Sequence, residues 1–216
     1  METNKGLIFG VDKSIIQLTA IVAFVFVFPV IDNKMVHDLF ASISYTLVLL
    51  SIFSIIEDRT KKLSYLVIVA VVSNLILFVT DDTVIRIVTF SISALTFIFA
   101  TGVLISHVSS SKNVTLGVVI QAISGYLLLG IIGVLINTIL LLFNENALSF
   151  SGIADKFSSI IYYSFITLTT IAYGEIVPES AAARSVAIFI GVAGQLYLTV
   201  IIALIIGKFL SADMRK

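Results

Sequence analysis

The chain has 216 residues, of which 59% are hydrophobic and only 12% are charged, and its mean hydropathy is +1.15. A soluble protein of this length cannot bury so much apolar surface, so the composition excludes an ordinary soluble domain and indicates a membrane protein. The formal net charge of zero argues against a nucleic-acid partner, and the absence of cysteine excludes disulfides, thiol catalysis and cysteine metal sites.

Apolar runs separated by short polar breaks predict how the chain is organised. A helix needs about 20 residues to cross about 30 Å of hydrocarbon. Six runs approach or exceed this length, and a shorter one lies between the fifth and the sixth. The six runs are 15–31, 39–56, 63–79, 84–106, 115–143 and 185–207, and the shorter one is 160–171. We therefore expect six membrane spans and one half-span.

The distribution of lysine and arginine near the span ends predicts the orientation. With the N-terminus in the cytoplasm, nine of these residues fall on the cytoplasmic side and four on the other side. We therefore expect a multi-pass protein of the cell membrane with both termini in the cytoplasm. The half-span then enters the membrane from the outside.

The fourth span lacks the pattern of a voltage sensor. Such a sensor needs several arginines at every third position, because each charge that crosses the membrane contributes only about 2.3 kcal/mol per 100 mV. This span carries Arg86 near its outer end, and the next seven residues are uncharged. We expect no conventional voltage sensor.

The half-span continues into an unusual sequence. Residues 167–178 read T-L-T-T-I-A-Y-G-E-I-V-P. Non-helical backbone at membrane depth is tolerated only inside protein or along a water-filled cavity. A short helix that ends near Thr170, followed by Ala172-Tyr173-Gly174 and Pro178, predicts a re-entrant element. The chain should enter, end its helix and return outward in an extended form.

Residues 167–178 resemble the pore signature of potassium channels, T-L-T-T-V-G-Y-G-D-I-x-P, at about ten of twelve positions. The resemblance covers roughly residues 115–210. It implies an all-α integral membrane protein with six transmembrane helices, a re-entrant pore helix and a filter loop, assembled as a homotetramer. Residues 1–110 would form a four-helix membrane domain, and residues 111–216 the pore domain.

The function implied by this resemblance is passive, potassium-selective conduction, without enzymatic activity. It needs no cofactor besides the permeant K⁺ ions. The implied partners are further copies of the same chain, the lipid bilayer and monovalent cations. Two rival classes fit poorly: a membrane enzyme needs a cluster of ionisable groups within the spans, and a transporter needs broken helices in both halves.

The resemblance also assigns roles to residues of the filter. Backbone carbonyls would hold K⁺ at Thr170, Ile171, Ala172 and Tyr173, with the Thr170 hydroxyl as a further ligand and Gly174 at the outer mouth. The side chains of Ile171 and Tyr173 would point away and pack on the pore helix. Thr167, Thr169 and Glu175 would support the filter.

Two positions depart from the potassium channel pattern. Ala172 stands where the family has glycine, and a Cβ atom in a left-handed conformation costs on the order of 1 kcal/mol. This leaves two alternatives open, a weakly selective cation channel and a non-conducting channel-like subunit. Glu175 replaces aspartate, and Ile166 stands where some members carry a glutamate that pairs with this acid, so that pair cannot form here.

The last span resembles the pore-lining inner helix. Gly194 lies twenty residues after Gly174, and it could serve as a gating hinge or as a site of close helix packing. One helix face could line the cavity or could pack on lipid or protein; its residues are Gln195, Leu198, Ile202 and Ile206.

The fifth span carries polar and small residues that suggest contacts between helices. Gln121 and Asn137 could hydrogen-bond across a helix interface, and the four glycines should allow close packing. The sequence leaves open whether the first four helices pack on their own pore segment or on that of a neighbour, and it leaves the gating stimulus open.

Overall fold

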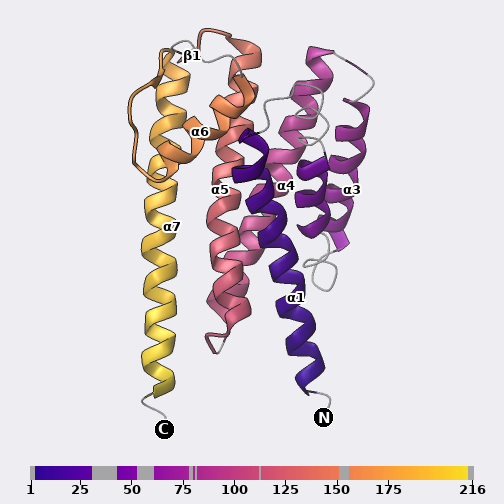
Figure 1. Cartoon of the computed structure of the whole chain (residues 1–216), viewed down its shortest axis with the longest axis vertical. Coiled ribbons are helices and arrows are strands. Elements are labelled where there is room, and N and C mark those ends of the chain that lie inside the picture. The colour runs from indigo at the N-terminus through magenta and orange to yellow at the C-terminus, as the bar shows by residue number, and fades with distance from the viewer. Residues whose placement is uncertain are drawn as a thin grey trace.

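The structure, a computed structural model, describes residues 3–30, 43–52, 61–77, 80, 82–111, 113–150 and 156–213. Figure 1 shows a bundle of long helices that run side by side. The start of α1 (Thr3–Val22) and the end of α7 (Ala181–Asp213) lie at the same end of this bundle.

The type of helix changes after α1. A π-helical stretch, Ala23–Val27, and a 3-10 turn, Phe28–Val30, follow α1 directly. The next described helix is Ile43–Ile52. The remaining helices are α3 (Lys61–Ile76), α4 (Thr83–Ser110), α5 (Leu116–Phe143) and α6 (Lys156–Leu168).

Among the described residues, three helices are long and apolar enough to cross a membrane: Thr83–Ser110, Leu116–Phe143 and Ala181–Leu210. They contain nearly all of the fourth, fifth and last predicted runs. There are also three shorter apolar helices. Ile43–Ile52 and Ser64–Ile76 lie within the second and third predicted runs, and Phe157–Leu168 overlaps the predicted half-span. The structure therefore confirms a largely helical membrane protein, while residues 31–42 and 53–60 lie outside the description.

Several helices differ from the predicted runs at their ends. The helix α7 extends beyond 185–207 on both sides, and α6 begins four residues before 160 and ends at Leu168. The physical reason is that polar residues can continue a helix outside the apolar region, so hydropathy alone does not mark its ends. At the start of α4, the Asp82 carboxylate accepts hydrogen bonds from the Val84 and Ile85 N–H groups at 2.8 and 3.1 Å.

A short connection joins α4 to α5. Residues 111–115 separate the two helices, so they form a helical hairpin. Figure 1 shows α4 and α5 side by side. In the single chain, α4 therefore packs on the α5 of the same chain.

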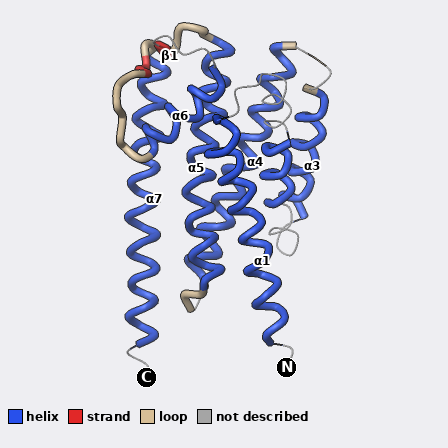
Figure 2. Tube along the Cα trace, viewed as in Figure 1, coloured by secondary structure: helices blue, strands red, loops and turns tan. Residues whose placement is uncertain are grey.

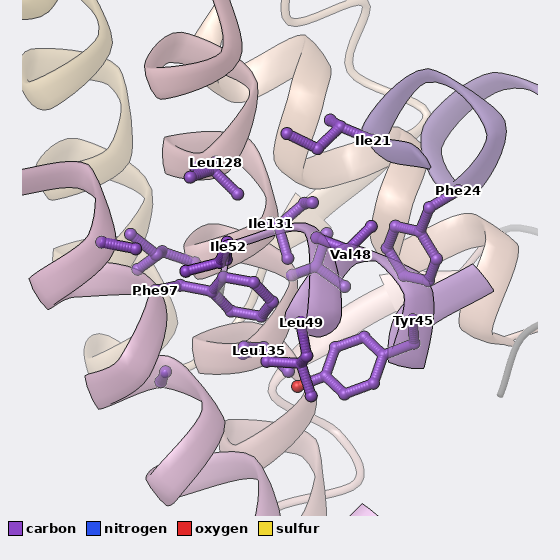
Figure 3. Close-up of a cluster of buried hydrophobic side chains, with 14 of the residues drawn as sticks. Ile21, Phe24, Tyr45, Val48, Leu49, Ile52, Phe97, Leu128, Ile131 and Leu135 are labelled. Carbon is purple, nitrogen blue, oxygen red and sulfur yellow. The ribbon is translucent and has the colours of Figure 1, made fainter. Parts of the chain in front are cut away.

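One apolar core joins the N-terminal helices to α5. Figure 3 shows Phe24, Tyr45 and Phe97 beside Ile131 and Leu135 of α5. The ring centroids of Phe24 and Tyr45 lie 5.9 Å apart, and those of Tyr45 and Phe97 lie 5.8 Å apart. The first helices therefore share their core with α5.

A two-stranded antiparallel ribbon was not expected from the sequence. Strand β1 (Leu148–Phe150) pairs with β2 (Ile176–Pro178), with Ser149 opposite Val177. Figure 2 shows an irregular segment that leaves α6, passes beside α7 and reaches this ribbon. The ribbon fixes the residues after the predicted filter to the residues after α5, so the fold is not strictly all-α.

Candidate ion-conduction site

The predicted pore helix, α6, is held against α5 by a buried hydrogen bond and by close packing. The Asn137 amide Nδ2 donates to the Ser164 Oγ at 3.0 Å, and both side chains are buried. A Cβ atom at Gly130 would collide with the ring of Phe165 on α6. These contacts confirm the predicted roles of Asn137 and of glycine on the fifth span.

A second predicted contact between helices lies nearer the start of α5. The Gln121 amide Nε2 donates to the Ser14 Oγ of α1 at 3.1 Å. Both side chains are buried, so this bond joins α1 to α5 inside the protein.

The helix α6 ends close to the position that the sequence predicts. Its last residue is Leu168, and Thr169 and Thr170 form a turn. The Thr169 Oγ1 donates to the Phe165 carbonyl at 2.8 Å, and the Thr170 N–H donates to the Thr167 carbonyl at 3.1 Å. These bonds turn the chain out of the helix and into the predicted filter.

The first residues of the predicted filter direct successive N–H groups to the same side. The N–H groups of Ile171 and Ala172 both donate to the Ile166 carbonyl of α6, at 2.9 and 3.2 Å. Because a trans peptide unit points its N–H and the preceding C=O in opposite directions, the carbonyls of Thr170 and Ile171 both point away from α6. A regular β-strand cannot do this, since its successive carbonyls alternate in direction.

The backbone φ angles explain how this arrangement is possible. Thr170, Ala172 and Gly174 have φ values of +61°, +44° and +92°, and the residues between them do not have positive φ. An alternation of left-handed and ordinary residues lets consecutive carbonyls share one side. Ala172 is therefore left-handed, which is the strained conformation that the sequence predicts for it.

The side chains of the predicted filter strand are exposed in the single chain. Ile171 is 53% exposed and Tyr173 is 70% exposed. Both belong to a stretch, 170–175, in which every residue is exposed. Packing of Ile171 and Tyr173 on a pore helix, as the resemblance implies, would therefore require the helix of a second copy.

Glu175 has a partner that sequence reasoning missed. The Tyr162 hydroxyl lies 2.6 and 3.0 Å from the two carboxylate oxygens of Glu175 and donates to this carboxylate. Tyr162 lies one helical turn before Ile166 and on the same face of α6. This spacing was the signal that could have identified Tyr162 as a substitute for the glutamate that position 166 lacks.

Comparison with known proteins agrees with this geometry. Residues 114–211 match the model of a family described as "Ion channel". This match supports an ion channel domain of the potassium channel type over these residues. The matched region contains α5, α6, the filter strand and nearly all of α7. No curated protein and no solved structure matches the chain.

Within this channel domain, Gly194 brings α7 against the end of α6. A Cβ atom at Gly194 would collide with the Leu168 carbonyl oxygen and with the Leu168 side chain. The helix α7 continues through Gly194 without a break. This contact supports the packing role for Gly194, and the role as a hinge stays a prediction.

The predicted cavity face of α7 begins next to the predicted filter, where Gln195 contacts Thr170. The Gln195 Nε2 donates to the Thr170 Oγ1 at 3.4 Å, and the Thr170 hydroxyl donates to the Thr169 carbonyl at 2.6 Å. Gln195, Ile202 and Ile206 are exposed, and Leu198 is half-buried. Gln195 thus contacts the first residue of the predicted filter, and the predicted cavity face is mostly exposed in the single chain.

Proposed function

We propose that the chain forms a passive potassium-selective ion channel with a T-I-A-Y-G filter at residues 170–174. A dehydrated K⁺ ion needs oxygen atoms that replace its lost water shell, and stacked backbone carbonyls can supply them. The ion channel domain at residues 114–211 supports conduction. The selectivity for potassium rests on the geometry of the filter strand.

The observation that carries this proposal is the direction of consecutive carbonyl groups. The carbonyls of Thr170 and Ile171 point away from α6, because the next N–H groups both bond to Ile166. The alternating φ angles at Thr170, Ala172 and Gly174 extend this pattern along the strand. The C-terminal end of α6 lies at the start of the strand, where its dipole favours a cation.

The pore is proposed to contain four copies of the chain. One strand offers oxygen atoms from one side only, so a cage around an ion requires further strands related by rotational symmetry. Apolar side chains that are open in the single chain support such an assembly, among them Ile171, Tyr173 and the exposed residues of α7. The rest of the outer surface would face the lipid bilayer.

The proposed topology has six spans, with α6 re-entrant from the outside and both termini in the cytoplasm. The start of α1 and the end of α7 lie at one end of the bundle, as this topology requires (Figure 1). Residues 1–110 would act as a four-helix membrane domain, and residues 111–216 as the pore domain in the cell membrane. No enzymatic step and no cofactor besides the permeant K⁺ enter this function.

A weakly selective cation channel is the second candidate, and Ala172 is the observation that favours it. At φ +44°, its Cβ atom strains the strand where the family has glycine. A strand that relaxes to relieve this strain would space its carbonyls less evenly around the ion. If the distortion at Ala172 closed the filter, the chain would instead be a subunit that does not conduct.

The deciding experiment is the reversal potential of the purified protein in planar bilayers, with potassium on one side and sodium on the other. We expect a reversal potential near the potassium equilibrium value. A reversal potential near zero with robust current would support the weakly selective channel, and it would contradict potassium selectivity.

The Ala172→Gly variant tests the role of the strain in the same measurement. Glycine adopts positive φ without a steric cost, so the variant should retain or increase the preference for potassium over sodium. A silent parent protein and a conducting Ala172→Gly variant would support the non-conducting subunit. A lower preference for potassium in the variant would show that strain at Ala172 does not limit selectivity.

A further inference from the structure

Two polar contacts fasten the lower half of α7 to the rest of its chain. The Tyr197 hydroxyl donates to the Ala122 carbonyl of α5 at 2.7 Å. Eleven residues later, or about 16 Å along the helix, the Lys208 ammonium contacts α4. Between these two points, Ile201 packs in a small buried cluster with Val118 and Val108 of the other two helices.

The Lys208 side chain caps the C-terminal end of α4. Its Nζ donates to the Val108 carbonyl at 2.5 Å and to the Ser109 carbonyl at 2.7 Å. The last carbonyls of a helix have no partner within the helix, and they carry the negative end of its dipole. The His107 carbonyl is satisfied locally by the Ser111 N–H at 3.0 Å, so Lys208 supplies the donors for the two carbonyls that follow.

The direction of this contact relative to the proposed pore follows from helix geometry. Residues two positions apart on an α-helix lie about 200° apart around its axis. Lys208 therefore points away from Ile206, which belongs to the exposed face that starts with Gln195 at the filter. The Lys208 contact pulls the end of α7 toward its own N-terminal helices and away from the axis that this face would line.

We propose that Lys208 is a positioning residue that favours the open pore by holding the cytoplasmic end of α7 against α4. This inference rests on the proposed function, since it assumes that four α7 helices surround the conduction path. Without the contact, the ends of the four helices would converge on the axis. The exposed isoleucines at 202 and 206 would then form an apolar constriction that excludes water.

The N-terminal helices gain a role in this mechanism. The helix α4 packs along α5 through a connection of only five residues, and Phe97 of α4 lies fully buried in the shared core. The C-terminal end of α4 is therefore fixed by the whole N-terminal bundle. A stimulus that displaces this bundle would reach the pore through Lys208.

Single-channel recording of the full-length protein tests this proposal with two variants of one position. Lys208→Met removes the charge and the donors but keeps a long side chain, whereas Lys208→Arg keeps both. We expect Lys208→Met to lower the ratio of open to closed time by about tenfold or more, since each of four subunits loses charge-assisted hydrogen bonds. Lys208→Arg should stay close to the parent protein.

The unitary conductance and the reversal potential separate this positioning role from general damage. Both should remain unchanged in Lys208→Met, because Gln195, the α7 residue that contacts Thr170 of the proposed filter, lies 13 residues, or about 20 Å, before Lys208 along the helix. An unchanged open probability in Lys208→Met would overturn the proposal. So would a fall in open probability that is accompanied by a changed unitary conductance or reversal potential.

A cysteine pair provides an independent test, because the chain contains no cysteine of its own. In the Ser109→Cys, Lys208→Cys double variant, a short bifunctional thiol reagent should link α4 to α7. We expect the link to raise the open probability, and a reducible reagent should make the effect reversible. A link that closes the channel would contradict the proposed direction of the contact.

The same pair distinguishes failure of this proposal from failure of the proposed function. A parent protein without current in any condition would contradict the conducting pore itself. The yield of the cross-link in membranes then still reports whether Lys208 lies against α4. Absence of the link, with both single cysteines reactive, would refute the contact on which the inference depends.

Discussion

At the scale of single residues, backbone strain is concentrated in the strand proposed as the filter. Among the described residues, Thr170 and Ala172 are the non-glycine positions with positive φ. Such conformations cost about 1–3 kcal/mol each, and they persist only where the surroundings fix them. Here the bonds to the carbonyls of Ile166 and Thr167 hold the strand in place. The strain therefore coincides with the residues proposed to bind the ion.

The contact between Tyr162 and Glu175 leads to a prediction for the outer end of the filter. In Tyr162→Phe, the Glu175 carboxylate loses its phenolic donor, and the strand after Gly174 loses one attachment to α6. We expect potassium currents to decline about two- to fivefold faster during sustained opening, as the loss of one charge-assisted hydrogen bond suggests. Macroscopic currents from the purified protein in bilayers measure this decline.

Tyr65→Phe is the matched control, because Tyr65 is an exposed tyrosine on α3, far along the chain from the filter. Its currents should decline at the parent rate. Equal rates in Tyr162→Phe and the parent protein would mean that the ribbon of β1 and β2 alone fixes the outer end of the strand.

At the scale of the elements, glycines determine how closely α5, α6 and α7 approach one another. Gly130 of α5 admits the Phe165 ring, and Gly194 of α7 admits the Leu168 carbonyl at the end of α6. The helix α6, the proposed pore helix, thus lies between two helices whose small residues face it. Its position, and therefore the start of the proposed filter, depends on these contacts.

Gly194→Ala should disturb the contact between α7 and α6. The added Cβ would meet a backbone oxygen, which cannot move aside as the end of a flexible side chain can. We expect a loss of about 1–3 kcal/mol in stability, as for overpacked interiors. Thermal unfolding of the protein in detergent measures this loss.

Gly191→Ala is the control on the same helix, since its Cβ would meet the Thr167 carbonyl at 3.6 Å, an ordinary contact distance. Its unfolding temperature should remain near that of the parent protein. Equal effects of the two substitutions would indicate that the cost arises from flexibility of α7 and not from the contact with Leu168.

At the scale of the whole molecule, the N-terminal helices and the channel domain share one apolar core. The cluster in Figure 3 takes residues from both segments, and Ile131 of α5 is fully buried within it. A buried hydrogen bond between Gln121 and Ser14 adds a second connection. The two segments should therefore unfold together.

The Ile131→Ala and Ile123→Ala variants test this connection with the same substitution on one helix. Ile131 is fully buried and Ile123 is 47% exposed. Ile131→Ala should lower the free energy of unfolding by about 2–5 kcal/mol in a single transition, because it leaves a cavity in the shared core. Ile123→Ala should have a much smaller effect. Two separate transitions would contradict a common core.

Hydropathy and local motifs predicted much of the architecture from the sequence. The three long apolar helices correspond to predicted runs, and the end of α6 lies two residues before Thr170. The roles of Asn137 and Gln121 were also predicted, because an amide in an apolar helix needs a partner. The start of α6 and both ends of α7 were less accurate, since polar residues extend these helices beyond the apolar region.

The sequence by itself determined the membrane class, the order of the helices and the end of α6 before the predicted filter, because these depend on local composition and on a contiguous motif. Only the tertiary structure revealed the partners of Glu175 and Lys208, which are Tyr162 and the end of α4. These partners lie 13 and about 100 residues away along the chain. Such contacts depend on how helices pack against one another, and no local pattern of residues specifies that packing.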